Sequence, residues 1–285
     1  MKMKIMKKAI NLPLLIIFQF ISLGSFAQKL TDQWRLIKET SRRIDQSPDG
    51  STYKYDAKGR LIEVNELNSK KKAAMVSTDF VYNEKDLITS YKVIYKNVEE
   101  DYDYYLFTYT YDDKERLTSI NEVHKKYDPK GETKNFYLQK FTYSPGLITR
   151  TGERTSFGGR QRDSVLNYVD KNGNITKSIF YYLSEDGSKI KKKEEEVNTP
   201  IVKTCPNPLF FTGSYFKTLF EAPQISIDES SIDTDKHFSD KYTYSFNKEG
   251  LLITINNTKR DLRYGVTLKF ITTYTYIKIP PATTK

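Results

Sequence analysis

The chain has 285 residues, of which 46 are lysine or arginine and 36 are aspartate or glutamate, giving a formal net charge of +10. This length suits one large or two small globular domains, and 13 glycines with 10 prolines exclude a collagen-like chain. Cys205 is the single cysteine, which excludes an intramolecular disulfide. Packing and backbone pairing must therefore stabilise the fold.

The first residues have the pattern of an export signal. Lysines precede an apolar stretch from Ile10 to Leu23, and Ser25–Ala27 then forms the small-x-small pattern of a cleavage site. We expect residues 1–27 to be a signal peptide and residues 28–285 to be a single exported domain. The apolar stretch is interrupted by polar residues and is shorter than the roughly 18 residues of a membrane span, so no transmembrane helix is expected after cleavage.

Tyrosines alternate with β-branched residues along much of the remaining chain. The sequence contains 22 tyrosines, and residues 104–111 and 274–277 are clear examples of the alternation. Aromatic and β-branched side chains pack well on a half-buried pleated surface. Helical apolar spacing is nearly absent, so an all-β fold is expected.

A short motif recurs where these strands end. The sequence Tyr-Asp-Ala-Lys-Gly-Arg-Leu of residues 55–61 returns as Tyr-Asp-Asp-Lys-Glu-Arg-Leu at 111–117, and weaker copies follow. Each copy combines an aromatic strand end, a side chain that can bond its own backbone, and usually a glycine for the left-handed position of a hairpin turn. The residues expected to build hairpin turns are Tyr55, Asp56, Gly59, Tyr111, Asp112, Tyr127, Asp128, Gly131, Gly146, Gly173 and Gly250.

The motif at residues 55–61 resembles the YD repeat of the RHS-type proteins. The order of signal peptide, Trp34–Ile37 and widely spaced hairpins is also similar to uncharacterised secreted bacterial β-proteins built from the same element, over most of residues 51–256. In the RHS family the resemblance implies a long antiparallel ribbon wound into a shell around a toxic C-terminal domain. This chain has few copies at wider spacing, so the resemblance carries over the hairpins and not the toxin.

These features predict an antiparallel meander of YD-like hairpins that forms a curled sheet or a partly open barrel. Turns near Asp56 and Asp112 should lie at one edge of the sheet, because alternate turns of a meander share an edge. An irregular insertion at about 198–240 breaks the rhythm with prolines and helically spaced aromatic residues. It serves either as a plug, lid or docking segment, or as a crossover whose aromatic residues cover an open end of the sheet.

Residues that carry common enzyme chemistry are few. His124 and His237 are the only histidines, and neither lies in a recognised nucleophile motif or has zinc-ligand spacing with Cys205. We therefore expect no catalytic residue, no cofactor and no metal ligand. Clustered acids at 99–103 and 194–196 leave a glycan-active hydrolase as the alternative, since two carboxylates are sufficient for glycosyl transfer.

The function predicted from the sequence is an exported binding or structural module of the cell envelope without catalytic activity. Basic residues with tyrosines suit acidic ligands, so a glycan, a cell-wall polymer or a surface protein is the expected partner. An exported protein has little access to nucleic acid, and none is expected to bind. The periplasm, the cell surface and the extracellular space remain open. An outer-membrane β-barrel is a second alternative that fits the strand length, although Lys140 interrupts the apolar face it requires.

Overall fold

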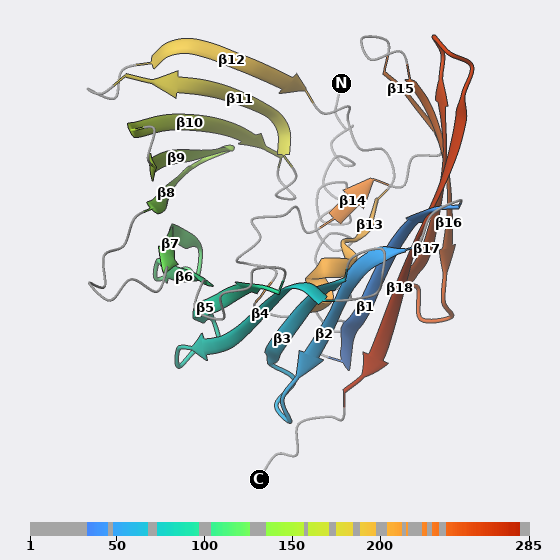
Figure 1. Ribbon diagram of the computed structural model, residues 1–285, viewed down its shortest axis with the longest axis horizontal. Coiled ribbons are helices and arrows are strands. Elements are labelled where there is room, and N and C mark those ends of the chain that lie inside the picture. Colours follow the sequence, from blue (N-terminus) through green and yellow to red (C-terminus); the bar gives the residue numbers. More distant parts are fainter. Residues whose placement is uncertain are drawn as a thin grey trace, which may run out of the picture.

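A computed structural model shows the chain as a large curled β-sheet (Figure 1). It describes residues 33–44, 48–67, 73–96, 104–125, 135–156, 159–170, 175–184, 189–197, 204–212, 215, 224–226, 230–233 and 238–279. The signal peptide expected at residues 1–27 lies outside these residues.

The described residues form strands β1 to β18 and one short 3₁₀ helix, η1. The strands are β1 (Trp34–Arg43), β2 (Asp49–Tyr55), β3 (Leu61–Leu67), β4 (Ala73–Tyr82), β5 (Ile88–Tyr95), β6 (Tyr104–Tyr111), β7 (Leu117–Lys125), β8 (Asn135–Ser144), β9 (Leu147–Ser156), β10 (Gly159–Val169), β11 (Ile175–Leu183), β12 (Lys189–Val197), β13 (Thr204–Pro206), β14 (Gln224–Ser226), β15 (Ser230–Asp233), β16 (Phe238–Phe246), β17 (Leu252–Asp261) and β18 (Thr267–Lys278), and η1 is Pro208–Thr212.

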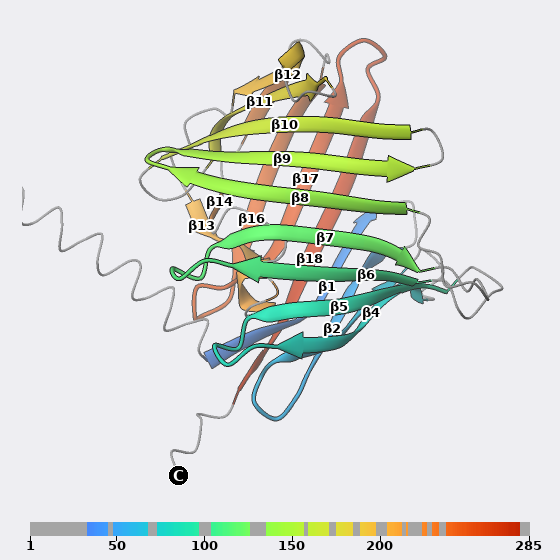
Figure 2. The same ribbon diagram turned by 90° about the vertical axis from the view of Figure 1, so that its left-hand side faces the viewer.

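Most of these strands belong to one 16-stranded antiparallel sheet, and β13 pairs with β14 separately. From β1 to β12 each strand pairs with the next along the chain, which confirms the expected meander. The sheet is open, with β12 and β15 as its edge strands, and it curls until these two ends face each other (Figure 1). Figure 2 shows β4 to β10 stacked on one side of the curl, with β16 to β18 crossing behind them.

The first and last long strands of the chain pair with each other, which the sequence did not predict. β18 lies beside β1, and Tyr276 is directly opposite Leu36. The same pairing of tyrosine and aliphatic residue flanks the hairpin turns, as between Tyr55 and Leu61. β18 and β1 therefore pair in the same register as the two strands of a hairpin, although no turn connects them.

The turn after β2 shows how the recurrent motif folds. The Asp56 N–H donates to the Arg60 carbonyl at 2.8 Å, and the Gly59 N–H donates to the Asp56 carbonyl at 2.9 Å. The Asp56 carboxylate also accepts the N–H groups of Lys58 and Arg60, both at 2.9 Å. Asp56 thus accepts three backbone N–H groups of the turn, two of them through its side chain as a turn-forming Asx residue does.

The same hydrogen bonds recur after β4, β6 and β16, where Asn83, Asp112 and Asn247 stand in place of Asp56. The fourth residue of each turn has positive φ: +73° at Gly59 and +79° at Gly250. Glu115 has φ +60° at the equivalent position, so the hydrogen bonds hold a residue with a side chain in the left-handed region as well.

A ladder of tyrosines joins one hairpin to the next. Near the end of β2, β4, β6, β8 and β18, a tyrosine hydroxyl donates to a backbone carbonyl at or near the start of an earlier strand. The bonds of this tyrosine ladder run from Tyr55 to Leu36 (2.5 Å), Tyr82 to Leu61 (2.5 Å), Tyr111 to Ile88 (2.7 Å), Tyr143 to Leu117 (2.8 Å) and Tyr276 to Leu252 (2.9 Å). Because Tyr276 belongs to β18, the ladder continues across the join of the chain's two ends.

The apolar core lies on the concave face of β1 to β8. Ile88, Tyr109 and Phe141 are buried there, together with Phe211 of η1. β13 and β14 lie inside the curl in Figure 1, and η1 between them packs against β1. The described part of the insertion expected at 198–240 therefore covers the concave face with aromatic side chains.

The convex face carries exposed ion pairs. Alternation places Lys54 and Glu63 there as an ion pair at 2.7 Å, and Lys92 pairs with Asp79 at 2.8 Å. Exposed pairs of this kind contribute little to stability, about 0.2–1 kcal/mol each. These pairs meet water, while the concave face holds the core.

Candidate functional site

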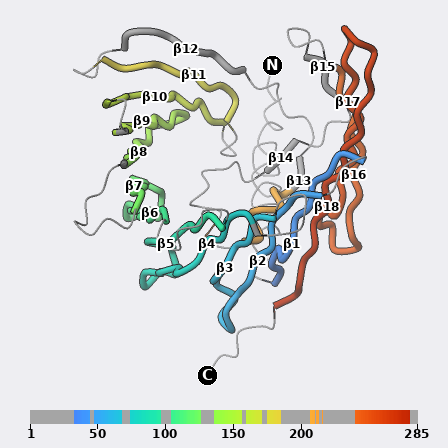
Figure 3. The backbone as a smooth tube through the Cα atoms, viewed as in Figure 1, coloured from blue at the N-terminus to red at the C-terminus, as the bar shows by residue number. Residues whose placement is uncertain are grey.

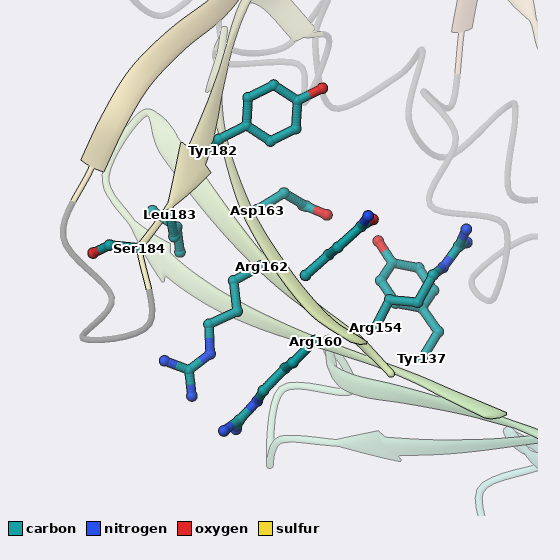
Figure 4. A pocket seen from close by; sticks show the side chains of 9 residues that line it. Tyr137, Arg154, Arg160, Arg162, Asp163, Tyr182, Leu183 and Ser184 are labelled. Atoms are coloured by element: carbon teal, nitrogen blue, oxygen red, sulfur yellow. The ribbon is translucent and has the colours of Figure 1, made fainter. Parts of the chain in front are cut away.

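A hollow with a volume of about 610 Å³ lies at one end of strands β8 to β11. Figure 4 shows its side chains from close by. The residues that line it are Tyr137, Arg154, Arg160, Gln161, Arg162, Asp163, Tyr182, Leu183 and Ser184.

Strand register divides these residues between the two faces of the sheet. Tyr137, Arg154 and Gln161 lie side by side on β8, β9 and β10, and Asp163 is opposite Tyr182 on the same face. This face is the concave one, because Asp163 shares a row with the buried Ile120 through Gly152 and Gln139. Arg160, Arg162 and Leu183 point to the other side, as Figure 4 shows.

The floor of the concave part is fixed by an ion pair over a glycine. Arg150 donates from Nη2 to Asp163 Oδ1 at 2.7 Å and from Nη1 to Gln139 Oε1 at 3.4 Å. A Cβ atom at Gly152 would come within 2.8 Å of the Asp163 carboxylate oxygens and of the Tyr137 hydroxyl. Glycine leaves room for these groups above β9, since a Cβ atom here would force the Asp163 carboxylate and the Tyr137 hydroxyl to shift.

Arg154 is the arginine of the hollow whose guanidinium is available to bind a ligand. Its guanidinium lies 4.9 Å from the centre of the Tyr137 ring, a cation–π distance, and its side chain is exposed. No carboxylate in the described ranges lies at ion-pair distance from it. Arg160 and Arg162, by contrast, are both held by Glu153, at 2.5 and 3.3 Å.

Two flat aromatic rings flank Arg154 and Gln161. Tyr182 is 48% exposed, and Tyr137 is half-buried. Burial raises the pKa of Tyr137, and the nearby arginines oppose that rise, so its hydroxyl stays protonated and available as a hydrogen-bond donor at neutral pH. The concave part of the hollow thus combines two rings, one amide and one guanidinium that has no ion-pair partner among the described residues.

One carboxyl group beside this site has a shifted pKa. Glu122 of β7 lies opposite Tyr137, and partial burial raises its pKa, against the lowering effects of Arg154 and His124. His124 itself stacks on Tyr105, with ring centres 4.5 Å apart. A carboxyl with a raised pKa can act as an acid, but glycosyl transfer needs a second carboxylate across the substrate.

The residues predicted from the turn motif lie away from the hollow. Tyr55, Asp56, Gly59, Tyr111, Asp112, Gly146 and Gly250 are in or beside turns at the opposite ends of the strands. Tyr127, Asp128, Gly131 and Gly173 lie outside the described residues, as do the acids at 99–103 and His237. Glu194–Glu196 belong to the edge strand β12.

Arg150, Gly152 and Arg154 were not among the residues predicted from the sequence. The sequence feature that could have identified them is the pattern Arg-x-Gly-x-Arg within a predicted strand. It places two cations, with a glycine between them that has no side chain, on a face expected to be apolar. Tyr182 and Asp163 come from other strands, and only the register shows that they join this set.

Among the described residues, no three His, Cys, Asp or Glu side chains converge as metal ligands would. Within those ranges, no helix has the length and apolar character needed to cross a bilayer.

Fold and site together define an all-β protein whose open, curled antiparallel sheet carries a tyrosine- and arginine-lined hollow. No protein-family model and no curated protein matches the chain. Solved structures similar to it include a porin-like protein from Bacteroides uniformis, at 14% identity and TM-score 0.36 over 85% of this chain and 96% of that one. Another is a porin-like protein from Bacteroides vulgatus, at 9% identity and TM-score 0.43 over 85% and 98%.

A third similar structure is that of the Photorhabdus luminescens Tc holotoxin pore, at 12% identity and TM-score 0.21. It covers 77% of this chain and 13% of the toxin chain. Identities and scores at this level do not transfer a function, so the function is argued from this chain's own residues.

Proposed function

We propose that this protein is an exported module of the cell envelope that binds an anionic glycan in the hollow of β8 to β11 and does not cleave it. The observation that carries the proposal is the set of Tyr137, Arg154, Gln161 and Tyr182 on one face. The lysine-rich start and the small-x-small pattern at Ser25–Ala27 support export. Protein recovered from the cell envelope should then begin at Gln28 by intact mass.

Each group of the set has a role in such binding. Tyrosine rings give large flat surfaces with few rotatable bonds, on which a sugar ring packs at low entropic cost. The planar Arg154 guanidinium matches a carboxylate or sulfate in a bidentate pair, and the Tyr137 ring beneath it holds its orientation. Gln161 supplies a donor and an acceptor for sugar hydroxyls.

The repeated turns support the proposal that the sheet is built from YD-type hairpins. Asp56 and Asp112 make the same set of backbone bonds, and Arg60 and Arg116 pair with them at 2.8 and 2.7 Å. Such a sheet serves as a rigid scaffold that presents the hollow at one end of its strands.

The ion pairs of the hollow favour binding without turnover. Asp163 is held by Arg150 and Glu153 by two arginines, so neither is placed as a free nucleophile or base. Glu122 is the one acid here whose raised pKa suits proton donation, and it keeps a glycan hydrolase as the second candidate.

The test is calorimetric titration of residues 28–285 with polygalacturonate, using the fully methyl-esterified polymer as the uncharged control ligand. Arg154→Gln should weaken binding roughly tenfold, because one charge-assisted contact is lost. Arg42→Gln, which removes an exposed charge far from the hollow, should leave the affinity unchanged.

Product analysis separates the two candidates. The wild-type protein should release no new reducing ends from the polymer. Release that disappears in Glu122→Gln would replace the binding module by the hydrolase, and equal affinity for charged and esterified polymer would contradict the role of Arg154.

A further inference from the structure

The turn between β17 and β18 displays apolar side chains to solvent. Leu262, Tyr264 and Val266 are 51%, 75% and 50% exposed, and Ile44 at the end of β1 is 52% exposed. Ile44 lies on the neighbouring strand at the level of Lys269, to whose carbonyl its N–H donates at 2.9 Å. We call Leu262, Tyr264 and Val266 the apolar tip. Figure 3 shows the turn at the outer end of the red segment.

The turn has an ordered backbone in spite of its exposure. The Asp261 N–H donates to the Val266 carbonyl and the Gly265 N–H to the Asp261 carbonyl, both at 2.9 Å. Asp261 Oδ1 accepts the N–H groups of Arg263 and Tyr264 at 2.9 and 3.2 Å, and Gly265 provides the positive φ of +67°. The apolar side chains are therefore presented on a fixed frame, which lowers the entropic cost of binding.

Exposed basic residues lie near the apolar tip. Arg260, Arg263 and Lys269 flank it on the same hairpin, and Arg42 precedes Ile44; all four side chains are exposed. The nearest acid of the hairpin, Asp261, accepts two N–H groups of the turn, and its Oδ1 lies 3.9 Å from Arg263 Nε. The Arg263 guanidinium lies 5.4 Å from the centre of the Tyr264 ring, so charge and aromatic surface form one unit.

We propose that the apolar tip inserts into the surface of a bilayer that contains anionic lipids. Aromatic and aliphatic side chains gain free energy at the boundary between head groups and acyl chains, and tyrosine suits that depth because its hydroxyl stays hydrated. Basic residues near the tip are attracted to anionic head groups. This combination of exposed apolar residues with nearby basic residues selects a negatively charged lipid surface over a neutral one. The site is separate from the hollow on β8 to β11.

The test is co-sedimentation of residues 28–285 with vesicles of phosphatidylcholine alone and with phosphatidylglycerol added. The protein should bind the anionic vesicles, and added salt should weaken that binding. The triple variant Leu262→Ser/Tyr264→Ser/Val266→Ser should bind them at least roughly tenfold more weakly, since its apolar insertion is lost. It should fold normally, because the substituted side chains are exposed.

A matched variant, Ile62→Ser/Val81→Ser/Ile277→Ser, removes exposed apolar residues elsewhere on the sheet and should bind as the wild type does. Arg154→Gln should also keep vesicle binding, which separates this site from the glycan site. Absence of binding to anionic vesicles, equal binding to neutral ones, or unchanged binding by the tip variant would overturn the proposal. A dimer in sedimentation velocity that the tip variant abolishes would assign the tip to a second copy instead.

Discussion

Gly59 and Gly250 occupy the same turn position with nearly the same φ, yet their surroundings differ. A Cβ atom at Gly59 would lie 3.3 Å from Ile279 Cδ1 and 3.4 Å from an Arg35 guanidinium nitrogen, whereas none would be met within 4 Å at Gly250. Gly250→Ala should cost about 1–2 kcal/mol of unfolding free energy from left-handed strain alone. Gly59→Ala should cost about 1 kcal/mol more, because Arg35, which donates to the Gly59 carbonyl, must move as well.

Urea denaturation of the two variants measures this difference. Equal losses would mean that Arg35 and Ile279 do not pack on the turn. The motif itself predicted Gly59 as a turn residue, but its neighbours come from the two ends of the chain, which no local pattern reveals.

The tyrosine ladder makes a second prediction at the scale of single residues. Tyr111→Phe removes the bond to the Ile88 carbonyl and should destabilise the protein by about 1–2 kcal/mol, since that part-buried carbonyl loses its donor. Tyr264→Phe removes an exposed hydroxyl and should have no effect on the unfolding free energy. A similar loss in both variants would show that the ladder does not stabilise the sheet.

At the scale of hairpins, the turns predict acid sensitivity. Hydrogen bonds from the Arg116 side chain and backbone lower the pKa of Asp112. The pKa of Asp56 is also lowered: partial burial acts to raise it, but the bonds from Arg60 and Lys58 outweigh that effect. A folded-state pKa below the unfolded one means that the ionised carboxylates stabilise the fold above the unfolded pKa, and that this contribution is lost as pH falls below about 4.

The variant Asp56→Asn/Asp112→Asn isolates this contribution. Asparagine already makes the same turn bonds at Asn83 and Asn247, so the hairpins should form, while the unfolding free energy should fall less steeply between about pH 4 and pH 2. Chemical denaturation at each pH gives the slopes. An unchanged slope would mean that Asp56 and Asp112 do not cause the acid sensitivity.

The hairpins were the most predictable elements, because turn chemistry is local. Asp, Gly and the following aliphatic residue specify the turn within a few positions, and alternation specifies the strands beside it. The hollow was not predictable to the same degree. Tyr137, Arg154, Asp163 and Tyr182 come from separate strands, and their meeting depends on the register of three strand pairs.

At the scale of the whole molecule, the join of β1 to β18 closes the chain on itself. Thr40 and Thr273 are directly opposite each other, with hydroxyl oxygens 2.5 Å apart. In a Cys205→Ser background, Thr40→Cys/Thr273→Cys should therefore form a disulfide on mild oxidation, seen as a mobility shift on non-reducing gels. Thr40→Cys/Thr243→Cys should not, because β16 is separated from β1 by two strands. Absence of the first crosslink would contradict the observed strand order.

Sequence patterns predicted the all-β curled sheet but not this join. A meander implies that consecutive strands are neighbours, and nothing local in Trp34–Arg43 indicates pairing with Thr267–Lys278. The insertion was identified as irregular, and its packing of Phe211 against Tyr276 depends on the position of β18 beside β1.

The central claim, that the hollow binds an anionic glycan, is tested most directly by hydrogen–deuterium exchange of residues 28–285 with and without polygalacturonate. Added polymer should slow exchange in peptides that cover Tyr137, Arg154, Gln161 and Tyr182, and should leave the turns at Asp56 and Asp112 unchanged. Arg154→Gln should remove that protection. Protection confined to other strands, or none at a polymer concentration that saturates binding, would contradict the claim.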